Sequence, residues 1–126
     1  MKSPSRTACV LNDGDRFVHE IAELLDGLDY CIFQEHNFDR FITMIAEIDP
    51  DLMLIPEATL SADDNLLPML RLLTDNVIAV TGYGDGALTA SALLRGADLC
   101  VTPDMPDGEL LARLYACERR LLAFTA

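Results

Sequence analysis

The regular alternation of short apolar runs with helical segments constrains the fold of this chain more than any other feature. The third apolar run, residues 52–55, is almost wholly apolar, which is typical of a central strand covered by helices on both faces. Parallel strands need such helical crossovers, and right-handed crossovers lead to a doubly wound sheet. We therefore predict an α/β fold with a five-stranded parallel sheet in the order 2-1-3-4-5. The predicted strands are residues 7–11, 30–34, 52–55, 77–81 and 99–102.

Helical periodicity and end signals fill the segments between these strands. Asp15 is a predicted N-cap, and Gly27 is a predicted stop for the helix between them. Asn37 is the predicted cap of a second helix, which ends at Asp49 and Pro50. Three further helices are predicted. The first carries the apolar residues of 66–73, the second spans residues 87–95, and the third runs from a cap at residue 107 to about residue 122.

Size and charge limit the classes of function. We expect one domain over residues 7–124, after an N-terminal tail at 1–6, in a chain of 126 residues with 51% hydrophobic residues. No apolar run approaches the ~18 residues of a membrane span, so we expect a cytoplasmic protein that does not bind membranes. The formal net charge of −12 repels a phosphate backbone, so we expect no direct nucleic-acid binding by this domain.

The cysteines give no metal or disulfide pattern. Cys9, Cys31, Cys100 and Cys117 are widely spaced, without a C-x-x-C pair, and the two histidines lie near none of them in sequence. A zinc site requires clustered His and Cys ligands. We therefore expect reduced, buried core thiols and no cofactor.

Polar residues follow the predicted strands at their carboxyl ends. In a sheet of this order, ligands bind at that edge, near the switch point between the first and third strands. The candidate positions are Asn12, Asp13 and Asp15 after the first strand, Pro56 and Glu57 after the third, Thr81 at the fourth and Thr102 at the fifth.

In order and spacing, several passages resemble the receiver domain of two-component response regulators, over nearly the whole chain. They are residues 10–13, 49–55, 77–81, 96–98, 102–103 and 109–114. The resemblance implies a flavodoxin-like (βα)5 fold. In receivers, two acids after the first strand and an aspartate ending the third hold Mg²⁺, and that aspartate accepts a phosphoryl group. A Thr or Ser after the fourth strand and a Lys after the fifth contact that group, which suits the charge developed during transfer.

This sequence departs from the receiver pattern at three points. Asn12 stands where the first acid is expected, whereas Asp13 retains the second. Pro56 stands at the nucleophile position, and proline has no group that accepts a phosphoryl group. Thr102 stands in place of the lysine, and Thr81 is retained. The resemblance therefore implies a degenerate phosphorylation pocket with no catalytic residue.

Two alternatives use the same edge of the sheet. Glu57 is a substitute phosphoacceptor in the first, although one step along a strand turns a side chain to the other face. In the second, the vacated pocket at Asp13, Pro56 and Thr81 holds a small ligand. Asp13 and Asp15 are weak candidates for a divalent metal ion, and otherwise form a loop and a helix cap.

The last helix resembles that of receivers attached to winged-helix DNA-binding domains, which dimerise through the fourth helix, fifth strand and fifth helix. Asp98 and Arg113 match charged positions of that dimer face, or form a plain contact within one chain. Cys100 stands where active receivers carry an aromatic residue that moves on phosphorylation. The implied dimer residues are Leu88, Ala92, Arg95, Asp98, Leu111 and Arg113.

Together these observations predict an atypical, phosphorylation-independent receiver-like module rather than an enzyme. We expect it to form a homodimer and to be the regulatory half of a transcriptional response regulator, with a C-terminal DNA-binding output domain in the full-length protein.

Overall fold

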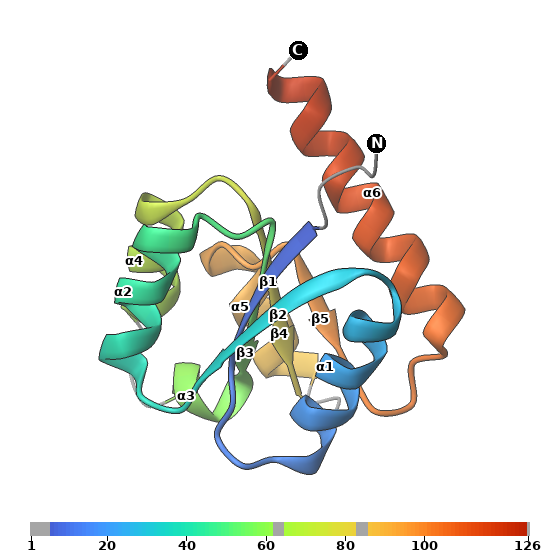
Figure 1. Ribbon diagram of the computed structural model, residues 1–126, viewed down its shortest axis with the longest axis horizontal. Coiled ribbons are helices and arrows are strands. Elements are labelled where there is room, and N and C mark those ends of the chain that lie inside the picture. Colours follow the sequence, from blue (N-terminus) through green and yellow to red (C-terminus); the bar gives the residue numbers. More distant parts are fainter. Residues whose placement is uncertain (1–5, 62–64, 83–85, 126) are drawn as a thin grey trace.

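The predicted parallel sheet is present in the computed structural model, which describes residues 6–61, 65–82 and 86–125. Its strands pair in parallel in the order β2-β1-β3-β4-β5, which confirms the predicted order. Both ends of the described chain lie at the amino edge of the sheet, where β1 begins (Figure 1). The strands are β1 Arg6–Leu11, β2 Tyr30–Glu35, β3 Leu52–Pro56, β4 Val77–Thr81 and β5 Leu99–Val101.

Helices cover both faces of the sheet, as the apolar third strand predicts. On one face, α1 (Arg16–Gly27) and α6 (Asp107–Thr125) pack on a core that includes Leu52 and Leu54 of β3. On the other face, α2 (Phe38–Ile48), α4 (Leu66–Leu73) and α5 (Gly86–Arg95) pack on a core that includes Met53 and Ile55. Figure 1 shows α2 and α4 on one side of the strands and α1 and α6 on the other. Strand β3 is therefore buried on both faces because its side chains alternate between the two cores.

Two predicted helix caps form as the residue types require. The Asp15 carboxylate accepts a hydrogen bond from the backbone N–H of Phe17 at 2.8 Å, at the start of α1. The Asn37 side-chain oxygen accepts one from the backbone N–H of Arg40 at 3.1 Å, at the start of α2. Each cap satisfies a backbone donor that the first turn leaves without an intrahelical partner.

Several element boundaries differ from the prediction. Arg6, expected in the tail, is the first residue of β1, and Pro56 is the last residue of β3. A short helix, α3 (Glu57–Ser61), was not predicted, because five residues are too few to show a helical period. Strand β5 ends at Val101 rather than at Thr102, and α6 begins at Asp107, which was expected to be its cap, and continues to Thr125.

The cysteine prediction is confirmed for two residues. Cys9 and Cys117 are buried, and Cys100 is partly buried. Cys31 is exposed, against expectation, because β2 is an edge strand with little covering its outer part. All four residues are thiols rather than disulfides, and burial raises the pKa of the Cys9 thiol to about 11. Across the described residues, no helix has both the length and the apolar run that crossing a bilayer requires.

Candidate functional site

The sheet brings the predicted strand-end residues to one edge. In the β3–β4 register, Pro56 is the partner of Thr81, and both residues are buried. The β1–β3 register pairs Val10 with Leu54, so two residues further along both strands Asn12 lies level with Pro56. Because Thr81 pairs with Val101, Thr102 lies one residue beyond the same edge. Four of the five expected pocket positions, Asn12, Pro56, Thr81 and Thr102, are therefore at neighbouring strand ends, and Asp13 follows Asn12 in the loop.

The side chain of Asn12 is directed away from this row of strand ends. Its Nδ2 donates a 2.9 Å hydrogen bond to Oε1 of Gln34, on the edge strand β2. Its Oδ1 accepts a hydrogen bond from the backbone N–H of Gly14 at 2.9 Å. Since β1 lies between β2 and β3, the amide turns toward the side opposite Pro56. An amide can donate to Gln34 where a carboxylate cannot, so this position serves the loop structure.

Asp13 and Asp15 have structural roles at the start of α1. The exposed Asp13 carboxylate accepts a hydrogen bond from the backbone N–H of Asp15 at 3.0 Å, and Asp15 caps the helix. This is an Asx-type turn, in which a carboxylate satisfies the backbone two residues further along. Among the residues that the structure describes, no three His, Cys, Asp or Glu side chains are grouped so as to hold a metal ion.

The Pro56 side chain has no nucleophilic group at the position where the resemblance implies a nucleophile. Its ring is buried at the end of the central strand β3. Proline is tolerated there because it interrupts a ladder of hydrogen bonds only at the strand's last residue. A covalent acceptor would need an oxygen or nitrogen nucleophile, which the pyrrolidine ring in a peptide does not have.

The alternative acceptor, Glu57, begins α3 and lies against a different set of residues. A Cβ atom built on Gly82 would stand 2.0 Å from Oε2 of Glu57, so the carboxylate occupies the space that a side chain at position 82 would need. The thiol of Cys100 has a raised pKa, through burial first and then through the charge of Glu57. Because Cys100 packs on the core beneath α2, α4 and α5, the Glu57 carboxylate lies near that face of the sheet.

Thr102 and Cys100 have local partners within β5 and its flanking segments. The Thr102 hydroxyl donates a hydrogen bond to the Asp104 carboxylate. The Cys100 thiol lies 3.9 Å from the backbone carbonyl oxygen of Thr89 on α5. Gly82 and Asp104 were missed by the sequence prediction; an Asp two residues after a Thr is a weak signal, and nothing in the sequence indicates the close approach to Gly82.

The residues of the expected dimer face, α5–β5–α6, differ in their exposure. Arg95 and Arg113 are exposed, while Ala92 and Leu111 are partly buried; the side chain of Leu88 is outside the described part of the structure. Asp98 and Arg113 do not contact one another within the chain, because each has another partner. Arg113 pairs with Glu109 at 3.3 Å, one helical turn away.

Asp98 instead belongs to a network centred on Arg71 of α4. Nη1 of Arg71 donates to the Asp98 carboxylate at 2.8 Å and to the carbonyl oxygen of Gly96 at 2.9 Å. Nη2 donates to the carbonyl oxygens of Thr74, at 3.1 Å, and Asn76. The same Asp98 oxygen accepts the backbone N–H of Ile78 at 2.9 Å. Arg71 thereby fastens α4 to the amino ends of β4 and β5.

A second network joins α6 to the amino edge of the sheet, opposite the candidate site. Glu118 of α6 accepts a 3.0 Å hydrogen bond from the Tyr30 hydroxyl and pairs with Arg6 at 2.6 Å. The Arg6 guanidinium also lies 5.6 Å from the ring centre of Tyr115, within range of a cation–π contact. Burial, and then the charge of Glu118, raises the pKa of Tyr30 to about 12.

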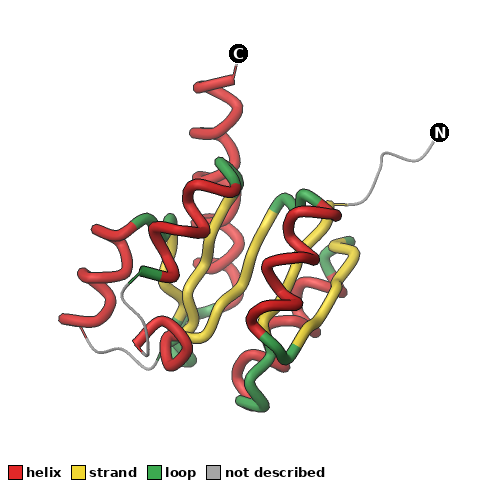
Figure 2. Tube along the Cα trace, turned by 90° about the vertical axis from the view of Figure 1, so that its left-hand side faces the viewer, coloured by secondary structure: helices red, strands yellow, loops and turns green. Residues whose placement is uncertain are grey.

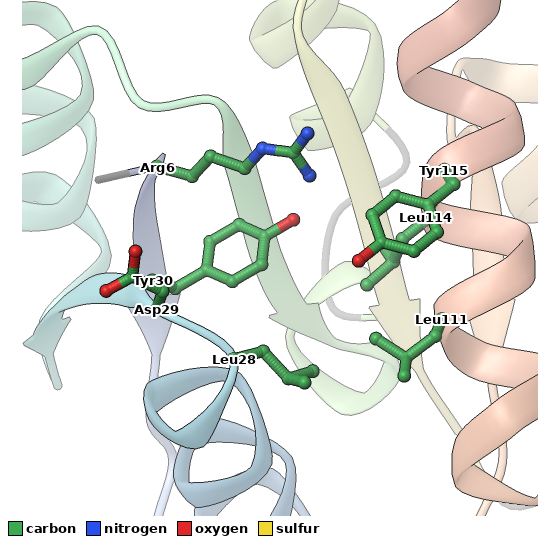
Figure 3. A pocket seen from close by; sticks show the side chains of 7 residues that line it. All are labelled: Arg6, Leu28, Asp29, Tyr30, Leu111, Leu114 and Tyr115. Carbon is green, nitrogen blue, oxygen red and sulfur yellow. The ribbon is translucent and has the colours of Figure 1, made fainter. Parts of the chain in front are cut away.

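Figure 3 shows the open pocket beneath this second network. It has a volume of about 230 Å³, and the Tyr30 and Tyr115 side chains lie on opposite sides of it, with Leu28 and Leu111 below them and Leu114 beside Tyr115. Two of the polar residues that line it, Arg6 and Tyr30, already have Glu118 as a partner. The pocket is therefore a feature of the attachment of α6.

Solved structures of response regulators are similar to this fold. A signal receiver domain from Bermanella marisrubri superposes with a TM-score of 0.71 and 22% identity, over 90% of this chain and 98% of that one. A response regulator from Thermotoga maritima gives a TM-score of 0.75 and 19% identity, over 90% and 97%. One from Burkholderia pseudomallei, solved with a phosphorylated aspartic acid, a calcium ion and citrate, gives 0.72 and 24%, over 96% and 73%.

Comparison at the level of sequence adds nothing to this likeness, since no family model and no curated protein matches the chain. The two superpositions with the Bermanella marisrubri and Thermotoga maritima structures each cover 90% of this chain, whose strand order is β2-β1-β3-β4-β5. The chain therefore has the fold of a response-regulator receiver domain.

Proposed function

We propose that this chain is a phosphorylation-independent receiver-type module of two-component signalling, which acts through protein contacts and regulates transcription through an attached output domain. The observation that carries the proposal is Pro56. It ends β3, level with Asn12 and beside Thr81, at the place where a receiver would need its acceptor carboxylate. A pocket without an acceptor cannot use phosphorylation as its signal.

The surroundings of Pro56 support the same reading. The Asn12 amide is committed to Gln34, and the carboxylates of Asp13 and Asp15 are committed to the turn and cap before α1. The side chains of Asn12, Asp13 and Asp15 therefore each have a structural partner here. The receiver fold is retained, whereas the residues at this edge of the sheet do not support phosphoryl transfer.

The direct test is incubation with acetyl phosphate and Mg²⁺, followed by mass spectrometry of the intact chain. We expect no mass gain of a phosphoryl group. A gain that is lost in Glu57→Gln would overturn the proposal and favour Glu57 as a substitute acceptor. Asp13→Asn is the matched control, because it removes a nearby carboxylate that is held by the backbone of Asp15.

Signalling through contacts requires a partner, and we propose that the partner is a second copy of the chain. Isologous dimers are the commonest assemblies of soluble proteins. On the face that the resemblance implies, α5–β5–α6, Arg113 is exposed and is paired with Glu109 of its own helix. Sedimentation of the wild type and of Arg113→Ala tests this face, and a strictly monomeric wild type would count against dimerisation altogether.

A further inference from the structure

Most of the large apolar side chains that the structure records as exposed gather on two neighbouring helices, α4 and α5, of which only α5 belongs to the face that the resemblance implies. Leu72 of α4 and Leu94 of α5 are each 88% exposed. Leu73, Leu93 and Met69, on the same two helices, are also exposed. We call these five residues the leucine ridge. Of the large hydrophobic residues that the structure records as exposed where side chains are described (which leaves out residues 87–88 and those after 118), Phe33 and Tyr115 are the two that lie elsewhere.

The helical period explains why these residues face solvent. Leu70 is buried beneath α4, and Leu72 lies two residues further along, about 200° around the helix and so on the opposite side. On α5, Ala92 packs on the core, and Leu94 lies two residues further along. The two most exposed leucines therefore project outward from the same layer, the layer that covers β3 and β4.

Contacts of Arg71 show that the carboxyl ends of α4 and α5 lie together. Arg71 immediately precedes Leu72 and bonds the carbonyl oxygen of Gly96, two residues after Leu94. Its side-chain carbon would be 3.2 Å from a Cβ atom on Gly96, so the two segments are in van der Waals contact. The leucine ridge is thus one surface of the molecule formed by two adjacent helix ends.

The same surface has an unusual charge. The chain contains 21 acidic residues and has a net charge of −12, yet neither α4 nor α5 contains a single Asp or Glu. Their charged residues are Arg71, which is paired with Asp98, and Arg95. Two copies of so acidic a chain repel one another, and repulsion falls off with the ~8 Å Debye length at physiological salt. Contact through α4 and α5 lets the copies meet without bringing helix carboxylates face to face.

The expected face is less well suited to the same contact. Asp98, which would pair across the dimer with Arg113, is already bonded to Arg71 and to the backbone of Ile78. Leu111 is partly buried and lines the pocket beside Tyr30. If Asp98 paired with Arg113 of a second copy, Arg71 would lose its carboxylate partner. The new ion pair would therefore add little net stability to the dimer.

From these observations we propose that the homodimer forms through the leucine ridge of α4 and α5, rather than through α5–β5–α6. The arrangement is isologous, with the ridge of one copy packed on the ridge of the other. This inference rests on the proposed function only because both require the chain to associate with a second copy of itself. Two helices of this length make an interface below the standard size, so the dissociation constant is expected in the micromolar range.

Sedimentation velocity on four proteins tests the proposal: wild type, the double variant Leu72→Gln/Leu94→Gln, Phe33→Gln and Arg113→Ala. Both ridge leucines are solvent-exposed in one copy, so the double variant folds normally, which circular dichroism checks. Phe33 is the matched control, an exposed apolar residue on the edge strand β2. We expect a wild-type dimer at about 100 μM, unchanged in the two controls and weakened at least ~100-fold in the double variant.

Salt dependence separates the two faces independently. A contact that is apolar and opposed by net charge strengthens as salt is raised, whereas one held by Asp98–Arg113 pairs weakens. If the dimer persists in Leu72→Gln/Leu94→Gln, or is lost in Arg113→Ala, the leucine ridge is not the dimer interface, although the chain still dimerises. A monomeric wild type overturns both. Open-ended association, with species beyond the dimer, overturns the isologous arrangement.

Discussion

Replacing Arg71 by Met should destabilise the domain strongly for a change at a partly exposed residue. The substitution keeps an apolar stem and removes the guanidinium, which donates to the Asp98 carboxylate and to the carbonyl oxygens of Gly96, Thr74 and Asn76. A hydrogen bond to a charged group contributes about 1.5–3 kcal/mol, but three of the four acceptors here are neutral carbonyl oxygens, for which we take only about 0.5–1.5 kcal/mol each. The side chains of Arg71 and Asp98 are 27% and 31% exposed, so solvent screening favours the lower figures.

The lower figures sum to about 3 kcal/mol of unfolding free energy, a substantial part of the ~5–15 kcal/mol of a typical domain. Urea unfolding followed by circular dichroism measures this loss. In a double-mutant cycle, Asp98→Asn should show a coupling to Arg71→Met of about 1–2 kcal/mol. Arg113→Ala is the control, since its exposed pair with Glu109 is worth less than about 0.5 kcal/mol. A loss below about 1 kcal/mol, or no coupling, would refute the role given to this network.

Three further predictions concern single residues. The pKa of Tyr30 is raised to about 12, so its neutral hydroxyl contributes stability below pH ~10, and this stability is lost as the pH rises toward 12. Absorbance titration of the wild type, compared with Tyr30→Phe, measures this pKa. At pH ~8 a thiol reagent should modify the exposed Cys31 quickly and the buried Cys9 only on unfolding, with Cys31→Ser removing the fast phase. Asp15→Ala should cost about 1 kcal/mol through loss of the α1 cap, whereas Asp15→Asn should cost much less in the same urea assay.

The sheet was predictable from the sequence because its signals are local. Apolar runs mark the strands, and Asp15 and Asn37 mark helix starts through hydrogen bonds within three residues. The row of strand ends at Asn12, Pro56 and Thr81 followed from the strand order alone. Those parts of the candidate site needed no knowledge of side-chain conformation.

Other parts depend on side chains that meet across long stretches of chain. Asp98 pairs with Arg71, 27 residues away, and no periodicity indicates which arginine it will find. The turn of Asn12 toward Gln34 is a rotamer choice, decided by a partner on another strand. Glu57 was expected near a strand end, but its approach to Gly82 depends on α3, which is too short to predict.

The network at the amino edge gives α6 the mechanics of a lever. Leu110 and Leu114 press the helix against the sheet near its start, and Glu118 is tied to Arg6 and Tyr30 further along. Beyond that tie the helix extends past the sheet (Figure 2). Because α6 is held at two separate points, its projecting turns move together with the part of the helix that is attached to the sheet. A small tilt of that attached part therefore becomes a larger displacement at the carboxyl-terminal end of the helix.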